Sequence, residues 1–258
     1  MKDYFIAKDG DDELGGELKM LRILIVIPVS SSQWNKPTEI YASEYVSADT
    51  KIDVTNVEKA PESIECHHDS TLAAPATVEA VAEAERKGYD AVVIGCFDDP
   101  GLHAARERVS IPVLGLGETS MTIAPLLGNK FAVVSTGRNS RSIYERKAME
   151  LGLTKRLAYS SGIDVAVLKL TEERVKVKQS LLEEARKAID DYGVEVIVLG
   201  CGGMMGFSEE LSKILDVPVV DPLLVTVKMA ETLAALGLRH SKAWFYNIPT
   251  HKGSDAEE

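Results

Sequence analysis

An internal repeat constrains this chain more than any other feature of its sequence. The segment KGYDAVVIGC (87–96) matches DYGVEVIVLGC (191–201) in kind: each is an apolar run that ends in Gly-Cys. The two cysteines are 105 residues apart (201 − 96 = 105). A fixed separation between similar segments is the mark of a repeated structural unit.

The same register continues on both sides of these segments. Downstream, IPVLG (111–115) and VPVVD (217–221) are separated by 106 residues. Upstream, ILIVIPVSSS (23–32) and FAVVSTGRNS (131–140) are separated by 108. Three matching strand–turn units in the same order predict two halves that are built alike.

Short apolar runs rich in Val and Ile alternate with amphipathic segments along both halves. Such runs are typical of parallel strands that are covered on both faces. We therefore predict an α/β fold in which each half holds a four-stranded parallel sheet, with the halves related by a pseudo-twofold axis. The expected strands are 21–29, 51–58, 91–95, 111–116, 130–135, 157–160, 194–199 and 217–220.

Two of the intervening helices have clear end signals. Pro75 fits the first turn of a helix that ends before Gly88. Thr171 precedes a charge-rich helix that closes at Gly193, and its charges predict a solvated face. Further helices are expected near 102–109 and 208–215.

Cys96 and Cys201 are the strongest candidates for chemistry. Ligands of open parallel sheets bind beyond the carboxyl ends of the strands, and both cysteines follow such ends. In two facing halves they would approach one bound molecule from opposite sides, as a reaction that moves a proton between the two faces of a carbon requires. The alternative is that each is a small buried hydrophobe.

A cysteine pair suits acid–base catalysis without a cofactor. The pKa of a thiol falls at a helix N-terminus or among backbone N–H groups, so we expect one thiolate and one thiol at the site. The sequence has no lysine motif for a pyridoxal Schiff base. Cys66, His67 and His68 are adjacent but lack a second ligand pair at zinc spacing, so we predict no metal.

Composition limits the classes of binding partner and the cellular compartment that we expect for the protein. A formal charge of −11 disfavours nucleic acid, and no apolar stretch approaches the ~18–20 residues that span a bilayer. Three cysteines do not suggest a disulfide framework, which favours the cytoplasm. Residues 1–20 and 251–258 are expected to be solvated tails.

On these residues, the chain resembles the aspartate/glutamate racemase superfamily, and most of all its hydantoin and allantoin racemase branch. The resemblance covers about 21–245 and is strongest in GCFDDPGL (95–102) and LGCGGM (199–204), where the family carries its catalytic cysteines. It is also present in STGRNSRSIYERKAMELGL (135–153), similar to the family's segment that opens the second half.

The resemblance implies two Rossmann-like lobes with the active site in the cleft between them and a cofactor-independent, two-base isomerase. It also implies that the helix after Asp221 crosses back, which gives lobe 1 as 21–117 plus 222–250 and lobe 2 as 118–221. A homo-oligomer is expected on the same ground. The alternatives are an amino-acid racemase, a maleate- or malonate-type member of the family, and a bilobal small-molecule binding protein.

The residues after the cysteines depart from those of the family's amino-acid racemases. Phe97 and Asp98 replace Asn-Thr, and Gly202 and Gly203 replace Thr-Glu. An aspartate beside the pocket would repel a second carboxylate, and the glycines would leave room for a bulky group. Both changes favour a neutral ring such as a 5-substituted hydantoin. The family's asparagines after the first strand are also missing here, where the sequence reads IPVSSS.

Four further residues are candidates for substrate binding. Ser30 and Ser31 either bind a substrate carbonyl or cap a turn. Thr136 and Gly137 either offer N–H groups to a developing enolate or form an ordinary helix N-cap. For Asp98, the alternative to orienting a ring N–H is that it helps to form the turn before Pro100.

Overall fold

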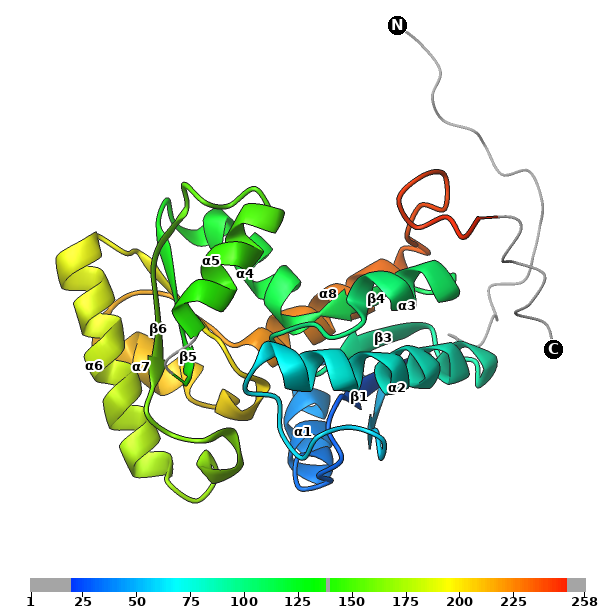
Figure 1. Ribbon diagram of the computed structural model, residues 1–258, viewed down its shortest axis with the longest axis horizontal. Coiled ribbons are helices and arrows are strands. Elements are labelled where there is room, and N and C mark those ends of the chain that lie inside the picture. Colours follow the sequence, from blue (N-terminus) through cyan, green and yellow to red (C-terminus); the bar gives the residue numbers. More distant parts are fainter. Residues whose placement is uncertain (1–19, 138–139, 250–258) are drawn as a thin grey trace, which may run out of the picture.

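The computed structural model of the protein describes residues 20–137 and 140–249 (Figure 1). The predicted tails, 1–20 and 251–258, lie outside the described residues except for Met20.

In the described part of the chain, eight strands form two four-stranded sheets in which every neighbouring pair is parallel. The strand orders are β2-β1-β3-β4 and β6-β5-β7-β8, so the two halves share one topology. The predicted fold class is confirmed. The strands are β1 Leu21–Ile27, β2 Thr50–Asn56, β3 Ala91–Ile94, β4 Val113–Gly115, β5 Phe131–Thr136, β6 Leu157–Ile163, β7 Val196–Leu199 and β8 Val219–Val220.

The helices that connect these strands are α1 Asn35–Ser43, α2 His67–Arg86, α3 Leu102–Arg108, α4 Leu116–Leu127, α5 Ser140–Glu150, α6 Arg174–Tyr192, α7 Ser208–Leu215 and α8 Pro222–Ala235. Two short 3₁₀ helices, η1 Val167–Lys169 and η2 Gly202–Met204, lie in the second half. None of the described helices is both long and apolar enough to cross a membrane.

The last helix of each half packs on the opposite half. The helix α4 follows β4 of the first sheet but contacts β7 of the second. The helix α8 follows β8 of the second sheet but packs against β1, β3 and β4 of the first, as its path in Figure 1 shows. Because α4 and α8 also pack on each other, this exchange joins the two sheets along a shared interface.

The central strands are buried on both faces, as their continuous apolar runs predict. In β1, Ile23 and Ile25 face a core that is shared with the second sheet, whereas Leu24 and Val26 face a smaller core beneath α2 and α3. Burying one such side chain contributes about 1.5–3 kcal/mol. Two covered faces therefore hold each strand, and the turns at its carboxyl end, in place.

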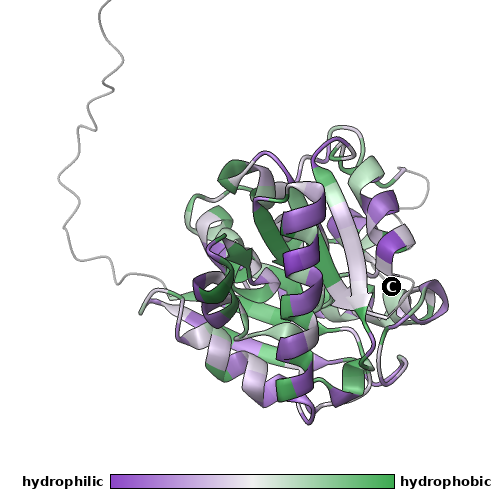
Figure 2. Ribbon diagram, turned by 90° about the vertical axis from the view of Figure 1, so that its left-hand side faces the viewer, coloured by the Kyte–Doolittle hydropathy of each residue, from purple (hydrophilic) through white to green (hydrophobic). Residues whose placement is uncertain are grey.

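The helix α6 shows how the outer layer is built. Its buried residues Val177, Leu181, Ala185 and Ala188 recur every three or four positions, which places them on one face against the sheet. Figure 2 looks onto this side of the molecule and shows hydrophobic strands enclosed by helices with hydrophilic outer residues. The charges of this helix therefore lie on a solvated face.

Two helix starts differ from the prediction. The helix α2 begins at His67, so Pro75 lies inside it rather than in its first turn. Proline ends or kinks many helices but is tolerated in some, and the earlier start leaves the segment 63–66 as a short loop. The helix α6 begins at Arg174 rather than after Thr171, since a turn over residues 171–173 separates it from the buried Leu170.

Candidate active site

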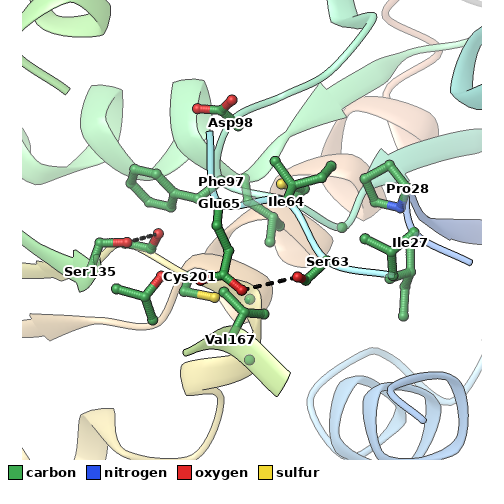
Figure 3. Close-up of a pocket in the computed structure, with 18 of the residues that line it drawn as sticks. Ile27, Pro28, Ser63, Ile64, Glu65, Phe97, Asp98, Ser135, Val167 and Cys201 are labelled. Atoms are coloured by element: carbon green, nitrogen blue, oxygen red, sulfur yellow. Dashed lines mark hydrogen bonds between the residues drawn. The ribbon is translucent and has the colours of Figure 1, made fainter. Parts of the chain in front are cut away.

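A cavity of about 130 Å³ lies between the two sheets, at the carboxyl ends of their strands. Both halves contribute to its walls, and Figure 3 shows side chains converging on it from several elements. The first half supplies the ends of β1 and β3 and the loop before α2. The second half supplies the ends of β5 and β7, part of α5 and η1.

Cys96 and Cys201 both line this cavity, each one residue beyond the glycine that follows its strand. The two turns approach each other closely, since a Cβ added to Gly202 would lie 3.2 Å from the carbonyl oxygen of Gly95. The repeat therefore brings two thiols, 105 residues apart in sequence, to one small space from opposite sheets.

Gly202 and Gly203 also line the cavity, but their missing side chains serve packing rather than room for the substrate. A Cβ on Gly203 would lie 2.9 Å from Leu170 and 3.2 Å from the ring of Trp34. The expectation that these glycines leave space for a bulky substituent was therefore wrong. They allow the two halves to approach closely around the sulfurs.

The thiol environments differ from the sequence-based expectation. Burial raises the pKa of Cys96 well above its usual value, and the Asp98 carboxylate raises it further, although the backbone N–H of Asp98 opposes this shift. Burial also raises the pKa of Cys201 to about 11, opposed by the backbone N–H of Gly203. We expected a lowered pKa, but neither cysteine begins a long helix, and burial outweighs the single N–H group beside each sulfur.

Glu65 is the main residue that sequence reasoning missed. It lies in the loop before α2, lines the cavity, and is close enough to Cys201 for its charge to raise the pKa of that thiol. The Ser63 hydroxyl donates a hydrogen bond of 3.0 Å to its carboxylate, and Figure 3 shows the carboxylate directed toward Cys201. The carboxylate with the larger effect on Cys96 is Asp98, with a smaller effect from Asp99, and the carboxylate that acts on Cys201 is Glu65.

The segment that carries Glu65 also contains Cys66, which lines the cavity, and His67 and His68, which are exposed. No cluster of three or more His, Cys, Asp or Glu residues in the described ranges is arranged to hold a metal ion. The sequence signal in this segment was the ECHHD run. Its cysteine and histidines suggested a metal site, and nothing in the run indicated that Glu65 lines a cavity.

Among the other predicted binding residues, Phe97, Asp98, Thr136 and Gly137 line the cavity. Phe97 is almost fully buried and packs edge-on against Tyr144, with ring centroids 5.1 Å apart. The N–H of Gly137 donates to the carbonyl of Ile163 at 3.1 Å, so it is already used and does not support the expected role toward an enolate.

Ser30 and Ser31 are not among the lining residues. The backbone N–H of Ser30 donates to Pro61, and its carbonyl accepts a hydrogen bond from Asn56, so this turn holds the neighbouring loop. The end of the first strand reaches the cavity instead through Ile27, Pro28 and Val29.

A buried hydrogen-bond cluster fixes the turn that carries Cys201. The Ser135 hydroxyl donates to the carbonyl of Gly200 at 2.6 Å, and the Tyr144 hydroxyl donates to the same carbonyl at 3.0 Å. Burial raises the pKa of Tyr144 well above its usual value, so its hydroxyl stays protonated and remains a donor. Since Gly200 directly precedes Cys201, this cluster limits the movement of the sulfur.

The chain is similar to several known proteins. The model of the Asp/Glu/Hydantoin racemase family matches residues 23–230. The chain is 36% identical to a hydantoin racemase of Paenarthrobacter aurescens, over 90% of this chain and 99% of the relative. It is 34% identical to a hydantoin racemase of a Pseudomonas species, over 90% and 93% of the two chains.

A solved structure is similar as well. The allantoin racemase from Klebsiella pneumoniae superposes with a TM-score of 0.85 at 33% identity, covering 89% of this chain and 94% of that one. The range that matches the family model, 23–230, includes residues of every strand in both sheets.

Proposed function

The chain belongs to the Asp/Glu/hydantoin racemase family, and from this premise we propose that it racemises 5-substituted hydantoins or a related cyclic ureide by two-base proton transfer without a cofactor. The observation that carries the proposal is that Cys96 and Cys201 enter one cavity from equivalent turns of opposite sheets. The hydantoin and allantoin racemases named above support the substrate class.

The reaction needs one cysteine as a thiolate and the other as a thiol. The thiolate takes the proton from C5, so that the C–H bond breaks, an S–H bond forms and an enolate remains. The second thiol then gives its proton to the opposite face of C5. The pair is left with its protonation states exchanged, ready for the reverse reaction, and no group outside the pair gains or loses a proton.

Forming the thiolate is costly in the unliganded protein. A thiol with a pKa of about 11 is ionised to roughly one part in ten thousand at pH 7. Burial accounts for most of this shift, and the neighbouring carboxylate adds to it. Catalysis at neutral pH therefore draws on a small thiolate population, and its rate should rise with pH.

The two carboxylates beside the sulfurs support a neutral substrate that carries N–H groups. An ionised carboxylate is purely an acceptor, so Asp98 and Glu65 suit the ring N–H groups of a cyclic ureide. The same charges oppose the carboxylate of an amino acid or a dicarboxylate. This contrast favours the hydantoin class over the amino-acid, maleate and malonate alternatives.

A panel of pure enantiomers tests the proposal. Purified protein should abolish the optical rotation of at least one 5-substituted hydantoin or allantoin, starting from either hand, and should leave glutamate and aspartate unchanged. Racemisation of the amino acids but not of the ureides would contradict it. Tight binding of a ureide with no loss of rotation would instead favour a binding protein.

A further inference from the structure

Two buried carboxylates, one in each half, are not used by the proton-transfer scheme. Asp99 lies in the loop of residues 96–101, which we call the Cys96 loop, and it accepts backbone hydrogen bonds from Gly117 at 2.9 Å and Glu118 at 2.7 Å. It therefore caps the first turn of α4. Lys147 of α5, in the other half, pairs with it at 2.7 Å, and both side chains are largely buried.

Asp221 has the corresponding place in the second half. It caps α8 by accepting from the backbone N–H of Leu223 at 3.0 Å. Its other oxygen accepts from the N–H of Gly206 at 3.2 Å, within residues 201–207, which we call the Cys201 loop. Tyr41 of α1, in the first half, donates its hydroxyl to the same oxygen at 3.0 Å.

The two arrangements are equivalent under the internal repeat. The helices α1 and α5 are the first helices of their halves, and Tyr41 and Lys147 are 106 residues apart (147 − 41 = 106), as are Gly115 and Asp221 (221 − 115 = 106). A Cβ on Gly115 would lie 2.3 Å from the Asp99 carboxylate. A carboxylate thus occupies the equivalent position in both halves. In the first half it belongs to Asp99 of the Cys96 loop, and in the second half it belongs to Asp221, which caps α8.

The Lys147 contact joins the Cys96 loop directly to the other half, whereas Tyr41 reaches the Cys201 loop through Asp221, which accepts from Gly206. A buried charge that loses its partner is strongly unfavourable, so the Asp99–Lys147 pair holds the Cys96 loop against α5 of the other half. Lys147 also neutralises Asp99, whose charge otherwise adds to the rise in the pKa of Cys96. Lys147 therefore fixes the position of the Cys96 loop and also compensates the negative charge of Asp99.

We infer that Lys147 and Tyr41 are positioning residues that act from the opposite halves, Lys147 on the loop of Cys96 and Tyr41 on the loop of Cys201. The inference rests on the proposed racemase function, because it assigns one residue to each face of the substrate.

Deuterium exchange at C5 distinguishes this role from a merely structural one. If Lys147→Met impairs Cys96 alone, the enantiomer whose proton Cys201 removes will still form the enolate, take deuterium from D₂O and return without inversion. Tyr41→Phe should give the same result with the opposite enantiomer. We expect overall racemisation to fall about 10- to 100-fold in Lys147→Met, as for other displaced catalytic groups.

Matched controls lie close to the two residues in sequence. Arg146→Met removes an exposed cation next to Lys147, and Tyr45→Phe removes an exposed hydroxyl one turn after Tyr41. Both should keep the wild-type ratio of exchange to inversion. The double variant Asp99→Asn/Lys147→Met removes both charges, so it keeps the test open if the single variant does not fold. An equal loss for both enantiomers, or no change in either variant, would overturn the inference.

Site-resolved alkylation by iodoacetamide tests the same assignment without a substrate. Lys147→Met should change the rate at Cys96 about threefold or more and leave Cys201 unchanged, and Tyr41→Phe should do the converse. Equal changes at both cysteines, or at neither, would overturn the inference. If the wild-type protein inverts no ureide, the proposed function fails, while alkylation still decides whether each loop is held from the opposite half.

Discussion

The Cys96 loop and the Cys201 loop occupy the same place in their halves but are built from different residues. The first, CFDDPG, is rich in side chains: Phe97 is buried, and Asp99 adopts a left-handed conformation with φ of 55°. The second, CGGMMGF, begins with two glycines and forms a 3₁₀ turn. The halves are therefore symmetric in where the sulfurs and the buried carboxylates lie, and asymmetric in which residues supply them.

This asymmetry extends to the charges near each thiol. The carboxylate beside Cys96 is Asp98, two residues away in the same loop. The carboxylate beside Cys201 is Glu65, which comes from the other half. The comparison predicts that matched substitutions in the two halves act on opposite faces of the substrate and differ in size.

Removing either sulfur should have the largest effect. We expect Cys96→Ser and Cys201→Ser each to lower kcat for racemisation by about 10²–10⁴-fold, the usual contribution of a general acid or base. Polarimetry with each enantiomer measures the loss. Full activity in either variant would break the equivalence of the halves, because one cysteine would then be sufficient.

Removing each of the two contacts between the halves should lower the free energy of unfolding by a different amount. Lys147→Met leaves Asp99 buried without its cation, which we expect to cost about 3–5 kcal/mol of unfolding free energy. Tyr41→Phe removes one neutral donor from a carboxylate that keeps its backbone donors, and should cost about 1 kcal/mol. Urea unfolding measures both. Equal losses of unfolding free energy in the two variants would show that the charged pair contributes no more to stability than the neutral hydrogen bond.

Much of this comparison follows from the sequence. The repeat located both cysteines, and the continuous apolar runs located all eight strands, because parallel strands buried on both faces leave a strong signal. Asp99, Asp221 and Lys147 form contacts between segments that are far apart in sequence. Those contacts exist only after the halves meet.

Other features of the structure either had a misleading signal in the sequence or had no signal at all. Pro75 indicated a helix start, yet α2 tolerates it in its interior. Glu65 lies in a loop outside the matched strand–turn segments. The direction of the thiol pKa shifts depends on burial, which the order of residues does not reveal.

Removing the carboxylate beside each sulfur should have the smallest effect. Each negative charge raises the pKa of its neighbouring thiol, so Asp98→Asn and Glu65→Gln should lower the pKa of Cys96 and Cys201 respectively. Alkylation of the affected cysteine should then begin at lower pH and run several-fold faster at fixed pH, because one pKa unit corresponds to a factor of about ten in thiolate.

Iodoacetamide labelling followed by mass spectrometry measures the two sites separately. Glu62→Gln, an exposed glutamate of the same segment that does not line the cavity, is the matched control for Glu65→Gln. A faster reaction of Cys96 in the Glu65 variant, or an equal change in the control, would contradict the assignment of Glu65 to Cys201.

The source of the new proton tests the two-base claim most directly. One pure enantiomer of a racemised hydantoin is incubated with the wild-type protein in D₂O, and both enantiomers are separated and analysed at early times. Two cysteines on opposite faces predict deuterium at C5 of the inverted enantiomer and protium in the remaining substrate. Protium retained in the inverted enantiomer, or deuterium appearing equally in both, would show that a single group serves both faces.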